Sequence, residues 1–495
     1  HVRSRRQRQM CIRDRLDTVA HEVLGSGKDI SSESGADKVA EIERRFKEDK
    51  VALAKYNLLD CILVTDIFEK LDIFELLIAR TKISGLLFDR LNISTAAFDH
   101  AYLPRLHRKG FIAPNRIDIS RDDSSTGGLV LTPEDGLHKN IAVFDFKSLY
   151  PTIIQTFKID PLSNISSDIN MIETPKGFQF SKSEHILPSI IDHLLIKRTQ
   201  AKDEGNDALS QAIKILMNSF YGIMGSSRSR FYHSDLPSAI TTTGHWVLKT
   251  SIEFFKLHGH HTLYGDTDSL FVTMKEDPKY SDQTTQAHDL ARELNIYLKR
   301  TIHDQFKVDS YLECEFEVMY DQIFFPVARG SLEGAKKRYV GFKDYELSFK
   351  GMEFVRSDWT ELAKNFQKEI FTKFFNGEPI EEFIKSYIKS LESGCFDDLL
   401  VYSKRLSKAP EEYTKNIPVH VKAALKINHT GPYRLKEVKY VITPNGPEPI
   451  DHNPTKFDYP HYIEKQLKPI ADDILFTQNS SFDSFILGDQ LSFGI

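Results

Sequence analysis

The sequence contains little cysteine and no long apolar run. Its four cysteines, at positions 11, 61, 314 and 395, lie far apart, which excludes a dense disulfide framework and a cysteine-based zinc cluster. No stretch approaches the roughly 18 uncharged apolar residues that a membrane-spanning helix needs. Sparse cysteine fits a reducing compartment, so we expect a cytoplasmic protein.

The composition is that of a soluble globular protein. The 495 residues are 40% hydrophobic and 27% charged, which is enough apolar material for a sizeable core and too much for a disordered chain. At about 150 residues per domain, the length predicts three or more packing units.

The net charge of −5 does not by itself exclude a nucleic-acid partner. The first fifteen residues hold six Arg and one Asp, so the other 480 residues sum to −10. An acidic total still permits a local basic groove. The Arg-rich leader has no apolar stretch and is no secretory signal. It is either a nucleic-acid-binding arm or a non-native extension, and we favour the extension because nothing downstream shares its composition.

Periodicity and turn residues predict the elements around the candidate site. The expected order is a helical region over 39–90, loops around 121–128, a strand within 140–151 that turns at Pro151, helices over 187–204 and 208–224 with Asp207 as N-cap of the second, a hairpin over 261–274, and helices from about 356.

Two carboxylates lie at the turn of the predicted hairpin. Asp266 and Asp268 are two residues apart, so in extended geometry they project to the same face. Apolar residues flank them on both sides, and two carboxylates backed by a core are costly unless a positive group neutralises them. A divalent metal would do so. Alternatively, the aspartates only favour the turn.

Asp145 interrupts a strongly apolar strand. Ile141, Val143 and the pair Phe144 and Phe146 predict a central strand, where a carboxylate needs a positive partner. The hairpin carboxylates would repel it unless a cation lay between them. Mg²⁺ with few protein ligands is the expected ion, and two such ions suit a 3′-hydroxyl nucleophile and a pyrophosphate leaving group.

Three ordered segments carry a family resemblance. DFKSLYPTII (145–154), KILMNSFYG (214–222) and YGDTDS (264–269) resemble motifs A, B and C of family B DNA polymerases, bacterial members above all. KKRY (336–339), KGMEFVRSDW (350–359) and HYIEKQLKP (461–469) extend the resemblance over nearly everything after the leader. It implies an α+β right-hand polymerase, with an antiparallel palm sheet and helical fingers and thumb, plus a partial ribonuclease H-like exonuclease remnant.

The resemblance also implies a division of the chain. Its parts are a leader over 1–15, the exonuclease remnant over 16–90, a linker or N-terminal region over 91–135, palm over 136–186, fingers over 187–225, palm again over 226–355, and thumb with a C-terminal tail over 356–495.

The implied activity is template-directed DNA synthesis in replication and repair. A primer 3′-hydroxyl attacks a dNTP with two Mg²⁺ ions, for which Mn²⁺ can substitute. Asp145 and Asp268 are implied to bridge the metals, Phe146 to supply a backbone carbonyl and Asp266 a supporting carboxylate. A nuclease that uses the same two-metal chemistry is another possible class.

Nucleotide contacts are implied next to motif A. Ser148, Leu149 and Tyr150 are expected to bind the nucleotide, and the Tyr150 ring is expected to lie under the sugar and exclude a 2′-hydroxyl. Tyr150 as a plain core aromatic is the alternative.

The helix over 208–224 has a polar stripe. Lys214, Asn218 and Tyr221 recur at i, i+4 and i+7 and therefore share a face, which is either solvated surface or a nucleotide platform. The resemblance implies the platform: Lys214 meets the triphosphate, Asn218 the nucleotide and Tyr221 the nascent base pair. Gly222 would allow close approach of DNA.

Two basic clusters have implied roles. Arg198 and Lys202, at i and i+4, would join Lys214 in a clamp on the β- and γ-phosphates. The contacts expected to grip the primer–template, largely independent of sequence, are Lys336, Lys337, Arg338 and Tyr339. Without the resemblance, both clusters would be ordinary charged surface.

Only one proofreading motif is recognisable. Tyr56 and Asp60, in YNLLD, resemble the last exonuclease motif, whereas the two earlier carboxylate motifs would lie before residue 16. One carboxylate cannot assemble a two-metal site. We therefore expect an N-terminally incomplete polymerase without proofreading.

The final residues resemble a sliding-clamp peptide. Gln490, Leu491 and Phe493 match part of that pattern but lack its adjacent Leu-Phe pair. The expected partners are primer–template DNA, dNTP and, through this tail, the sliding clamp; no membrane is expected, and the location is the bacterial cytoplasm at the nucleoid. A catalytically inactive, truncated DNA-binding fragment is the alternative.

Overall fold

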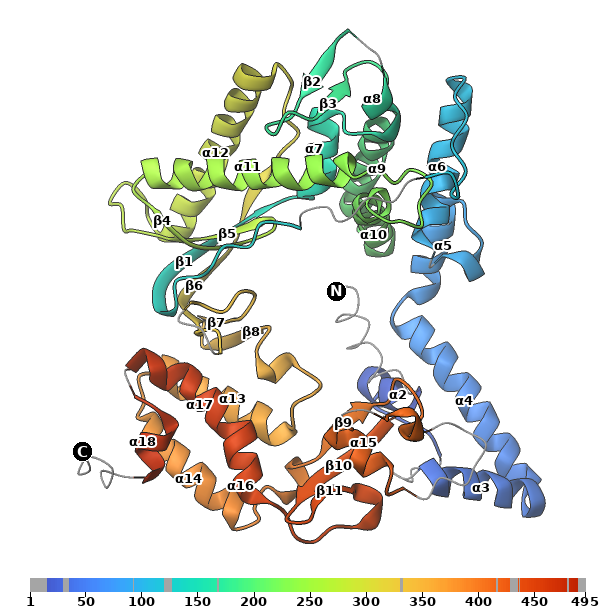
Figure 1. Ribbon diagram of the computed structural model, residues 1–495, viewed down its shortest axis with the longest axis vertical. Coiled ribbons are helices and arrows are strands. Elements are labelled where there is room, and N and C mark those ends of the chain that lie inside the picture. Colours follow the sequence, from blue (N-terminus) through green and yellow to red (C-terminus); the bar gives the residue numbers. More distant parts are fainter. Residues whose placement is uncertain are drawn as a thin grey trace. The chain divides into compact units, whose positions relative to one another are not determined.

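The structure is a computed structural model that describes residues 16–29, 35–91, 93–119, 127–166, 169–329, 333–414, 417–427, 435, 437–478 and 480–487 (Figure 1). The predicted leader over 1–15 and the predicted clamp tail lie outside these ranges. The chain divides into two compact units: unit 1 comprises 1–67, 134–138 and 321–495, and unit 2 comprises 68–133 and 139–320.

Unit 2 contains the motifs A, B and C. Its elements, including two strands that it shares with unit 1, are α5 (Ile73–Ser84), η1 (Phe88–Arg90), α6 (Ser94–Arg108), β1 (Gly136–Phe146), α7 (Leu149–Phe157), α8 (Pro161–Ile165), β2 (Met171–Glu173), β3 (Gln179–Ser181), α9 (Leu187–Asp203), α10 (Asp207–Met224), α11 (Asp235–Leu257), β4 (His261–Asp266), β5 (Ser269–Thr273), α12 (Gln283–Phe306) and β6 (Cys314–Phe325).

The main sheet of unit 2 places motif A beside motif C. Its strand order is β4-β5-β1-β6, and β5 pairs antiparallel with both β4 and β1. The registers oppose Asp145 to Ser269 on one side of β5 and Asp266 to Ser269 on the other. The end of β1 therefore lies next to the tip of the β4–β5 hairpin. This confirms the predicted hairpin and the predicted central strand.

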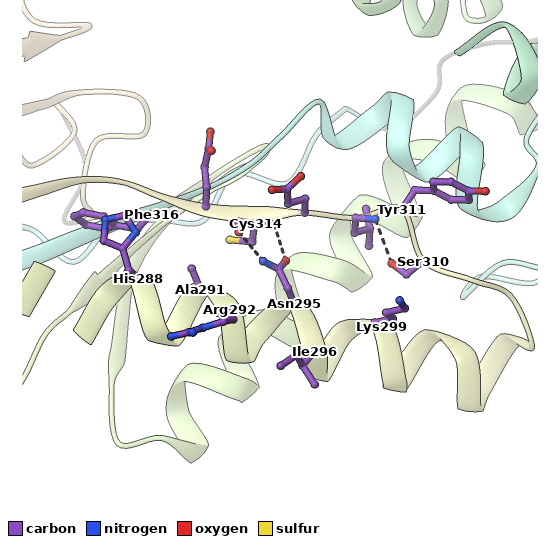
Figure 2. A pocket seen from close by; sticks show the side chains of 13 residues that line it. His288, Ala291, Arg292, Asn295, Ile296, Lys299, Ser310, Tyr311, Cys314 and Phe316 are labelled. Atoms are coloured by element: carbon purple, nitrogen blue, oxygen red, sulfur yellow. Dashed lines mark hydrogen bonds between the residues drawn. The ribbon is translucent and has the colours of Figure 1, made fainter. Parts of the chain in front are cut away.

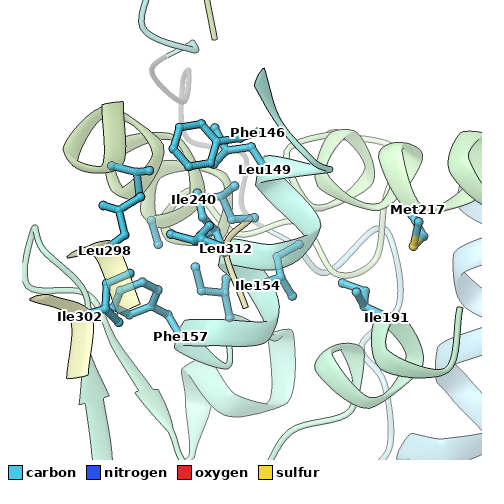
Figure 3. Packing of buried hydrophobic residues seen from close by; sticks show 14 of the residues in the cluster. Phe146, Leu149, Ile154, Phe157, Ile191, Met217, Ile240, Leu298, Ile302 and Leu312 are labelled. Atoms are coloured by element: carbon cyan, nitrogen blue, oxygen red, sulfur yellow. The ribbon is translucent and has the colours of Figure 1, made fainter. Parts of the chain in front are cut away.

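The core of unit 2 explains why β1 is apolar at successive positions. Ile141, Ala142, Val143 and Phe144 are all buried, as expected for a strand covered on both faces. Helix α11 packs on β4 and β5, and α7 packs on α9 and α11. Figure 3 shows Phe146, Leu149, Ile154 and Phe157 packed with residues from neighbouring elements.

The chain after β1 differs from the predicted turn at Pro151. Helix α7 begins at Leu149, preceded by Ser148 in the left-handed conformation (φ 51°, ψ 49°). Pro151 lies in the first turn of α7, where its missing N–H costs no intrahelical hydrogen bond. The reversal therefore takes place at Lys147 and Ser148, and Pro151 is compatible with the helix rather than a breaker.

Helices α9 and α10 confirm the predicted helix pair, but the N-cap of α10 lies one residue earlier than expected. The side chain of Asn206 accepts a hydrogen bond from the Leu209 N–H at 2.9 Å, whereas Asp207 is the first helical residue. Asn and Asp are both favoured N-cap residues, so the sequence pattern alone could not decide which of the two caps the helix.

This cap makes a first prediction. Asn206→Ala should lower the free energy of unfolding by about 1 kcal/mol, because the Leu209 N–H loses its acceptor. Asp207→Ala should cost less, because it removes only a charge near the helix start. Denaturant unfolding of the two variants measures this difference, and equal costs would contradict the assignment.

Unit 1 holds a second core. Its elements are α2 (Leu16–Leu24), α3 (Gly35–Glu48), most of α4 (Lys50–Lys70), the end of β6, β7 (Tyr339–Lys343), β8 (Glu346–Lys350), η2 (Glu353–Val355), α13 (Glu361–Phe375), α14 (Ile380–Glu392), η3 (Asp397–Leu399), β9 (Tyr402–Arg405), η4 (Pro410–Glu412), α15 (Val419–Ala424), β10 (Glu437–Thr443), β11 (Gly446–Pro449), η5 (Ile450–His452), α16 (Tyr459–Tyr462), the π-helical η6 (Ile463–Leu467), α17 (Lys468–Leu475), η7 (Phe476–Gln478) and α18 (Phe482–Leu487).

The packing in unit 1 follows the predicted helical stripe. Leu362, Phe366 and Ile370 of α13 are fully buried, and Phe374 is partly buried against the same core. The end of β6 pairs with β7, which pairs with β8, and a second sheet has the order β11-β10-β9. The predicted helical region over 39–90 consists of α3, α4 and α5. Within the described ranges, every helix is too short or too polar to span a bilayer.

Candidate active site

The hairpin tip is tighter than the extended geometry that we predicted from the sequence. Thr267 and Asp268 form the turn, and the Asp268 N–H donates to the Asp266 carbonyl at 2.7 Å. Thr267 has φ 65°, a conformation that a β-branched residue rarely adopts. Such strain persists only where the surroundings enforce it, and it gathers at functional sites. The two aspartates are therefore separated by a strained turn and do not simply share one face of a strand.

Asp145 and Asp268 come together at the sheet. The Phe146 N–H donates to the Asp268 carbonyl at 2.9 Å, which fixes the end of β1 to the hairpin tip. The pKa of Asp145 is raised to about 7, first by burial and then by the charges of Asp268, Glu317 and Glu315, although Lys214 lowers it. The electrostatic coupling indicates that the carboxylates of Asp145 and Asp268 are close neighbours.

The donor chemistry of this pair fits a divalent cation. The pKa of Asp145 is raised because burial and the neighbouring carboxylates both destabilise its charged form, and a bound cation would offset both effects. Among the residues that the structure describes, no group of three or more His, Cys, Asp or Glu side chains is arranged to hold a metal. Two aspartates suit Mg²⁺, which keeps several water or phosphate ligands.

Helix α10 presents the predicted polar stripe. Lys214, Asn218 and Gly222 are exposed and Tyr221 is half-buried, whereas Ile213 is buried on the opposite face. A β-carbon at position 222 would have no atom within 4 Å, so the helix surface is open there. Because Lys214 lowers the pKa of Asp145, its ammonium lies within electrostatic reach of the carboxylate pair.

Helix α9 brings Arg198 to the start of α7. Its guanidinium donates to the Ser148 hydroxyl at 3.3 Å, while its buried Nε has no hydrogen-bond partner among the described residues. Burial lowers the pKa of Arg198 despite the opposing effect of Glu315. A desolvated cation with an unfilled donor is suited to an anionic ligand. Lys202, four residues later, is exposed on the same helix.

Tyr150 is packed between motifs A and B. Its ring centre lies 4.5 Å from that of Tyr221, at an interplanar angle of 43°. Burial raises the pKa of the Tyr150 hydroxyl, as do Tyr221, Asp268 and Asp266, so the phenol stays neutral near the carboxylates. Leu149, in contrast, points into the core, where Figure 3 shows it beside Phe146. Only its backbone remains for a ligand.

Comparisons with known proteins show the family to which the chain belongs. A family model described as DNA polymerase family B matches residues 96–481. The chain belongs to DNA polymerase family B. DNA polymerase II of Escherichia coli (strain K12) is 40% identical over 490 residues, which cover 96% of this chain and 62% of that protein. A DNA polymerase of Archaeoglobus fulgidus is 35% identical over 353 residues, covering 67% of this chain and 41% of the relative.

A solved family B structure shares the fold. The family B DNA polymerase from the hyperthermophilic archaeon Pyrobaculum calidifontis matches with a TM-score of 0.63 and 25% identity, covering 93% of this chain and 61% of that one. The mixed helix and sheet content predicted from the sequence is thereby confirmed. The chain spans less than two thirds of the length of each of these relatives.

Sequence reasoning missed three acidic residues in the neighbourhood of Asp145 and Lys147. Glu315 and Glu317 both raise the pKa of Asp145, and Glu313 shares the Lys147 ammonium with Glu315 at 2.7 and 3.0 Å. All three are exposed and alternate with the more buried Cys314 and Phe316. These glutamates recur at every second position in ECEFE, and this alternation could have predicted that they share one face of a strand.

A groove adjoins these acidic residues. Its volume is about 620 Å³, and it lies between α12 and residues 310–316 (Figure 2). The side chain of Asn295 hydrogen-bonds both main-chain groups of Cys314, at 2.8 and 2.7 Å (Figure 2). Asn295 thus occupies the strand edge at this point, and we assign no ligand to the groove.

The KKRY segment in unit 1 has two kinds of residue. Lys336 and Lys337 are exposed, and Tyr339 is half-buried. The Arg338 guanidinium, only 17% exposed, instead contacts Glu353 at 2.9 Å and Asp473 at 3.0 Å. The resemblance implied that Arg338 contacts DNA phosphates, but its guanidinium instead belongs to this buried ion-pair cluster. The sequence pattern could not predict this cluster, because the two carboxylates lie 15 and 135 residues from Arg338 along the chain.

The predicted exonuclease residues share one partner. Tyr56 and Asp60 lie one turn apart on α4, and the Lys28 ammonium contacts the Asp60 carboxylate at 2.6 Å and faces the Tyr56 ring 5.6 Å from its centre. The clamp-binding candidates Gln490, Leu491 and Phe493 lie outside the described residues, so that expectation stays a prediction.

Proposed function

We propose that this chain is the polymerising portion of a DNA-directed DNA polymerase, which adds deoxynucleotides to a primer 3′-hydroxyl. The observation that carries the proposal is that Asp145 and Asp268 lie at neighbouring strand ends, joined by the hydrogen bond from the Phe146 N–H to the Asp268 carbonyl, with a raised pKa at Asp145. In this proposal the palm comprises residues 136–186 and 226–355, the fingers comprise 187–225 with α9 and α10, and the thumb and C-terminal tail comprise 356–495. The remnant over 16–90, the linker over 91–135 and the leader over 1–15 keep their predicted assignments.

The cofactor would be held by a small set of ligands. Asp145, Asp268 and the Phe146 carbonyl would bind two Mg²⁺ ions, with Asp266 in support and Mn²⁺ as a substitute. When bound, such ions activate the attacking hydroxyl and stabilise the leaving pyrophosphate. The residues that the chain itself adds are cationic: Arg198, whose Nε lacks a partner among the described residues, and Lys214 would neutralise the triphosphate.

The remaining contacts follow from position and exposure. Lys202 would extend the phosphate clamp, Ser148 would position Arg198, and the exposed face of α10 would carry Asn218 and Tyr221 to the nascent base pair. The open surface at Gly222 suits close approach of DNA. Duplex backbone would be held by Lys336, Lys337 and Tyr339, with Arg338 orienting this segment from its ion-pair cluster.

A primer-extension assay tests the activity. The protein should extend a 5′-labelled primer only with template, dNTPs and Mg²⁺, and release pyrophosphate. Release of mononucleotides would instead indicate a nuclease, and duplex binding without extension would indicate an inactive DNA-binding fragment. A cytoplasmic location at the nucleoid, a role in replication and repair, absence of proofreading, and sliding-clamp binding through 490–493 accompany the proposal as predictions.

Tyr150→Ala should relax sugar selection. The ring fills space beside the strained hairpin tip, so its removal should let a 2′-hydroxyl enter and lower the preference for dNTP over rNTP by about 10²-fold. Single-turnover incorporation of matched dATP and ATP measures this preference. Tyr311→Ala, at an exposed tyrosine of the same unit, is the control and should leave it unchanged. Unaltered selection in Tyr150→Ala would refute the sugar contact.

A further inference from the structure

Tyr150 is held on several sides by residues that leave little freedom. The Tyr221 ring packs against its ring, with the ring centres 4.5 Å apart. Near its ring edge lies Gly244, where even an added β-carbon would reach only ordinary contact distance, 3.6 Å. The hydroxyl end meets a third element. A β-carbon at Gly128 would lie 2.9 Å from the Tyr150 hydroxyl, closer than such atoms approach, and 3.0 Å from the Thr267 methyl group, which is an unusually tight contact.

The segment that carries Gly128 is fixed to the hairpin tip. The Thr267 N–H donates to the Leu129 carbonyl at 2.8 Å, and the Leu131 N–H donates to the Gly265 carbonyl at 2.9 Å. On the other side, a ring nitrogen of His245 shares a hydrogen bond with the Gly127 carbonyl at 3.0 Å. Position 128 therefore cannot retreat from Tyr150 without breaking bonds to the turn that contains Asp268.

We propose that Gly128 is a position that determines sugar specificity: its missing side chain sets how far the Tyr150 ring sits from the nucleotide. The inference rests on the proposed function, because it concerns the sugar contact of Tyr150. Gly128 touches no substrate in this scheme and acts through Tyr150, so it is a positioning residue.

The substitution Gly128→Ala is suited to a test because its clash is with the ends of side chains. The Tyr150 hydroxyl and the Thr267 side chain can yield by a few tenths of an ångström, whereas the backbone on both sides stays bonded. The expected cost therefore falls on the placement of the ring rather than on folding. A small misplacement of a positioning group is enough to change rates severalfold or more.

The neighbouring glycine provides a matched control. A β-carbon at Gly127 would have no atom within 4 Å, so Gly127→Ala makes the same chemical change one residue away without touching Tyr150. Gly128→Ala should lower the ratio of kcat/KM for dNTP to that for rNTP at least about threefold. Gly127→Ala should leave the ratio unchanged, and primer–template affinity should be the same in both variants.

Tyr150→Phe completes the cycle, because it keeps the ring and removes the oxygen that the new methyl group would meet. In the Tyr150→Phe background, Gly128→Ala should have a smaller effect on the ratio. An unchanged ratio in active Gly128→Ala, or an equal change in Gly127→Ala, would overturn the inference. If Gly128→Ala does not fold, recovery of folding in the double variant supports the contact, and continued failure overturns it. Absence of extension by the unsubstituted protein would instead defeat the proposed function.

Discussion

Asp268→Asn should abolish primer extension while duplex DNA still binds. The substitution removes the charge that faces Asp145 but keeps the size of the side chain and the main-chain bond to Phe146. A site that stabilises charge on transferring phosphoryl groups loses orders of magnitude when one such group is removed, so we expect a fall of about 10³-fold or more in the extension rate. Rapid-quench extension at saturating dNTP and Mg²⁺ measures it.

Two comparisons separate this effect from a general loss of structure. Asp304→Asn makes the same change at an exposed position of α12, where the carboxylate pairs with Arg300 at 3.7 Å, and should leave the rate unchanged. The extension rate of Asp266→Asn should lie between those of the other two variants, because the Asp266 carboxylate accepts a hydrogen bond from the Thr267 hydroxyl and supports the turn. Persistent extension by Asp268→Asn with a normal melting temperature would exclude the carboxylate pair as the site of catalysis.

The sequence was sufficient to predict the elements around this site because their signals are local. The apolar run around Asp145 predicted a central strand, and the four-residue spacing of Lys214 and Asn218 predicted their shared face. The turn at Thr267 was not predictable in the same way. Nothing in a β-branched residue favours φ 65°, which is held by hydrogen bonds from the segment over 129–131, more than a hundred residues away.

The partners of clustered charged residues were harder to predict than periodic patterns, because tertiary structure determines which groups a charged side chain meets. Three adjacent cations in KKRY looked alike in the sequence, yet Lys336 and Lys337 are exposed whereas Arg338 lies in a buried ion-pair cluster. That cluster joins two segments that the family resemblance had singled out separately, KKRY and KGMEFVRSDW, through Glu353, and it ties KKRY to Asp473 of α17. The contact between these segments gives a structural reason why they occur in the same chain, which no single motif shows.

Arg338→Met should therefore destabilise unit 1 strongly. Glu353 is fully buried and Asp473 is 5% exposed, and the second arginine, Arg329, contacts Glu353 at 2.8 Å but Asp473 only at 3.9 Å. Removing one partner of a buried ion pair leaves a carboxylate desolvated without compensation, at a cost of about 3–5 kcal/mol. Arg356→Met is the matched control. Its pair with Asp358, at 2.8 Å, joins an exposed arginine to a half-buried carboxylate and should contribute about 1 kcal/mol.

The pH dependence of this loss identifies its cause. The pKa of Asp473 is raised from 3.8 to about 7, chiefly by burial and also by Glu353, although Arg338 and Arg329 lower it. The folded state therefore holds a proton that the unfolded state has released between these values, so this carboxyl makes stability fall as pH rises from about 4 to about 7. Without Arg338 the pKa of Asp473 rises further, and the fall continues above pH 7. Urea unfolding should show that Arg338→Met loses more free energy of unfolding above pH 7 than below it. A loss that does not depend on pH would instead come from packing and not from the unpaired charge of Asp473.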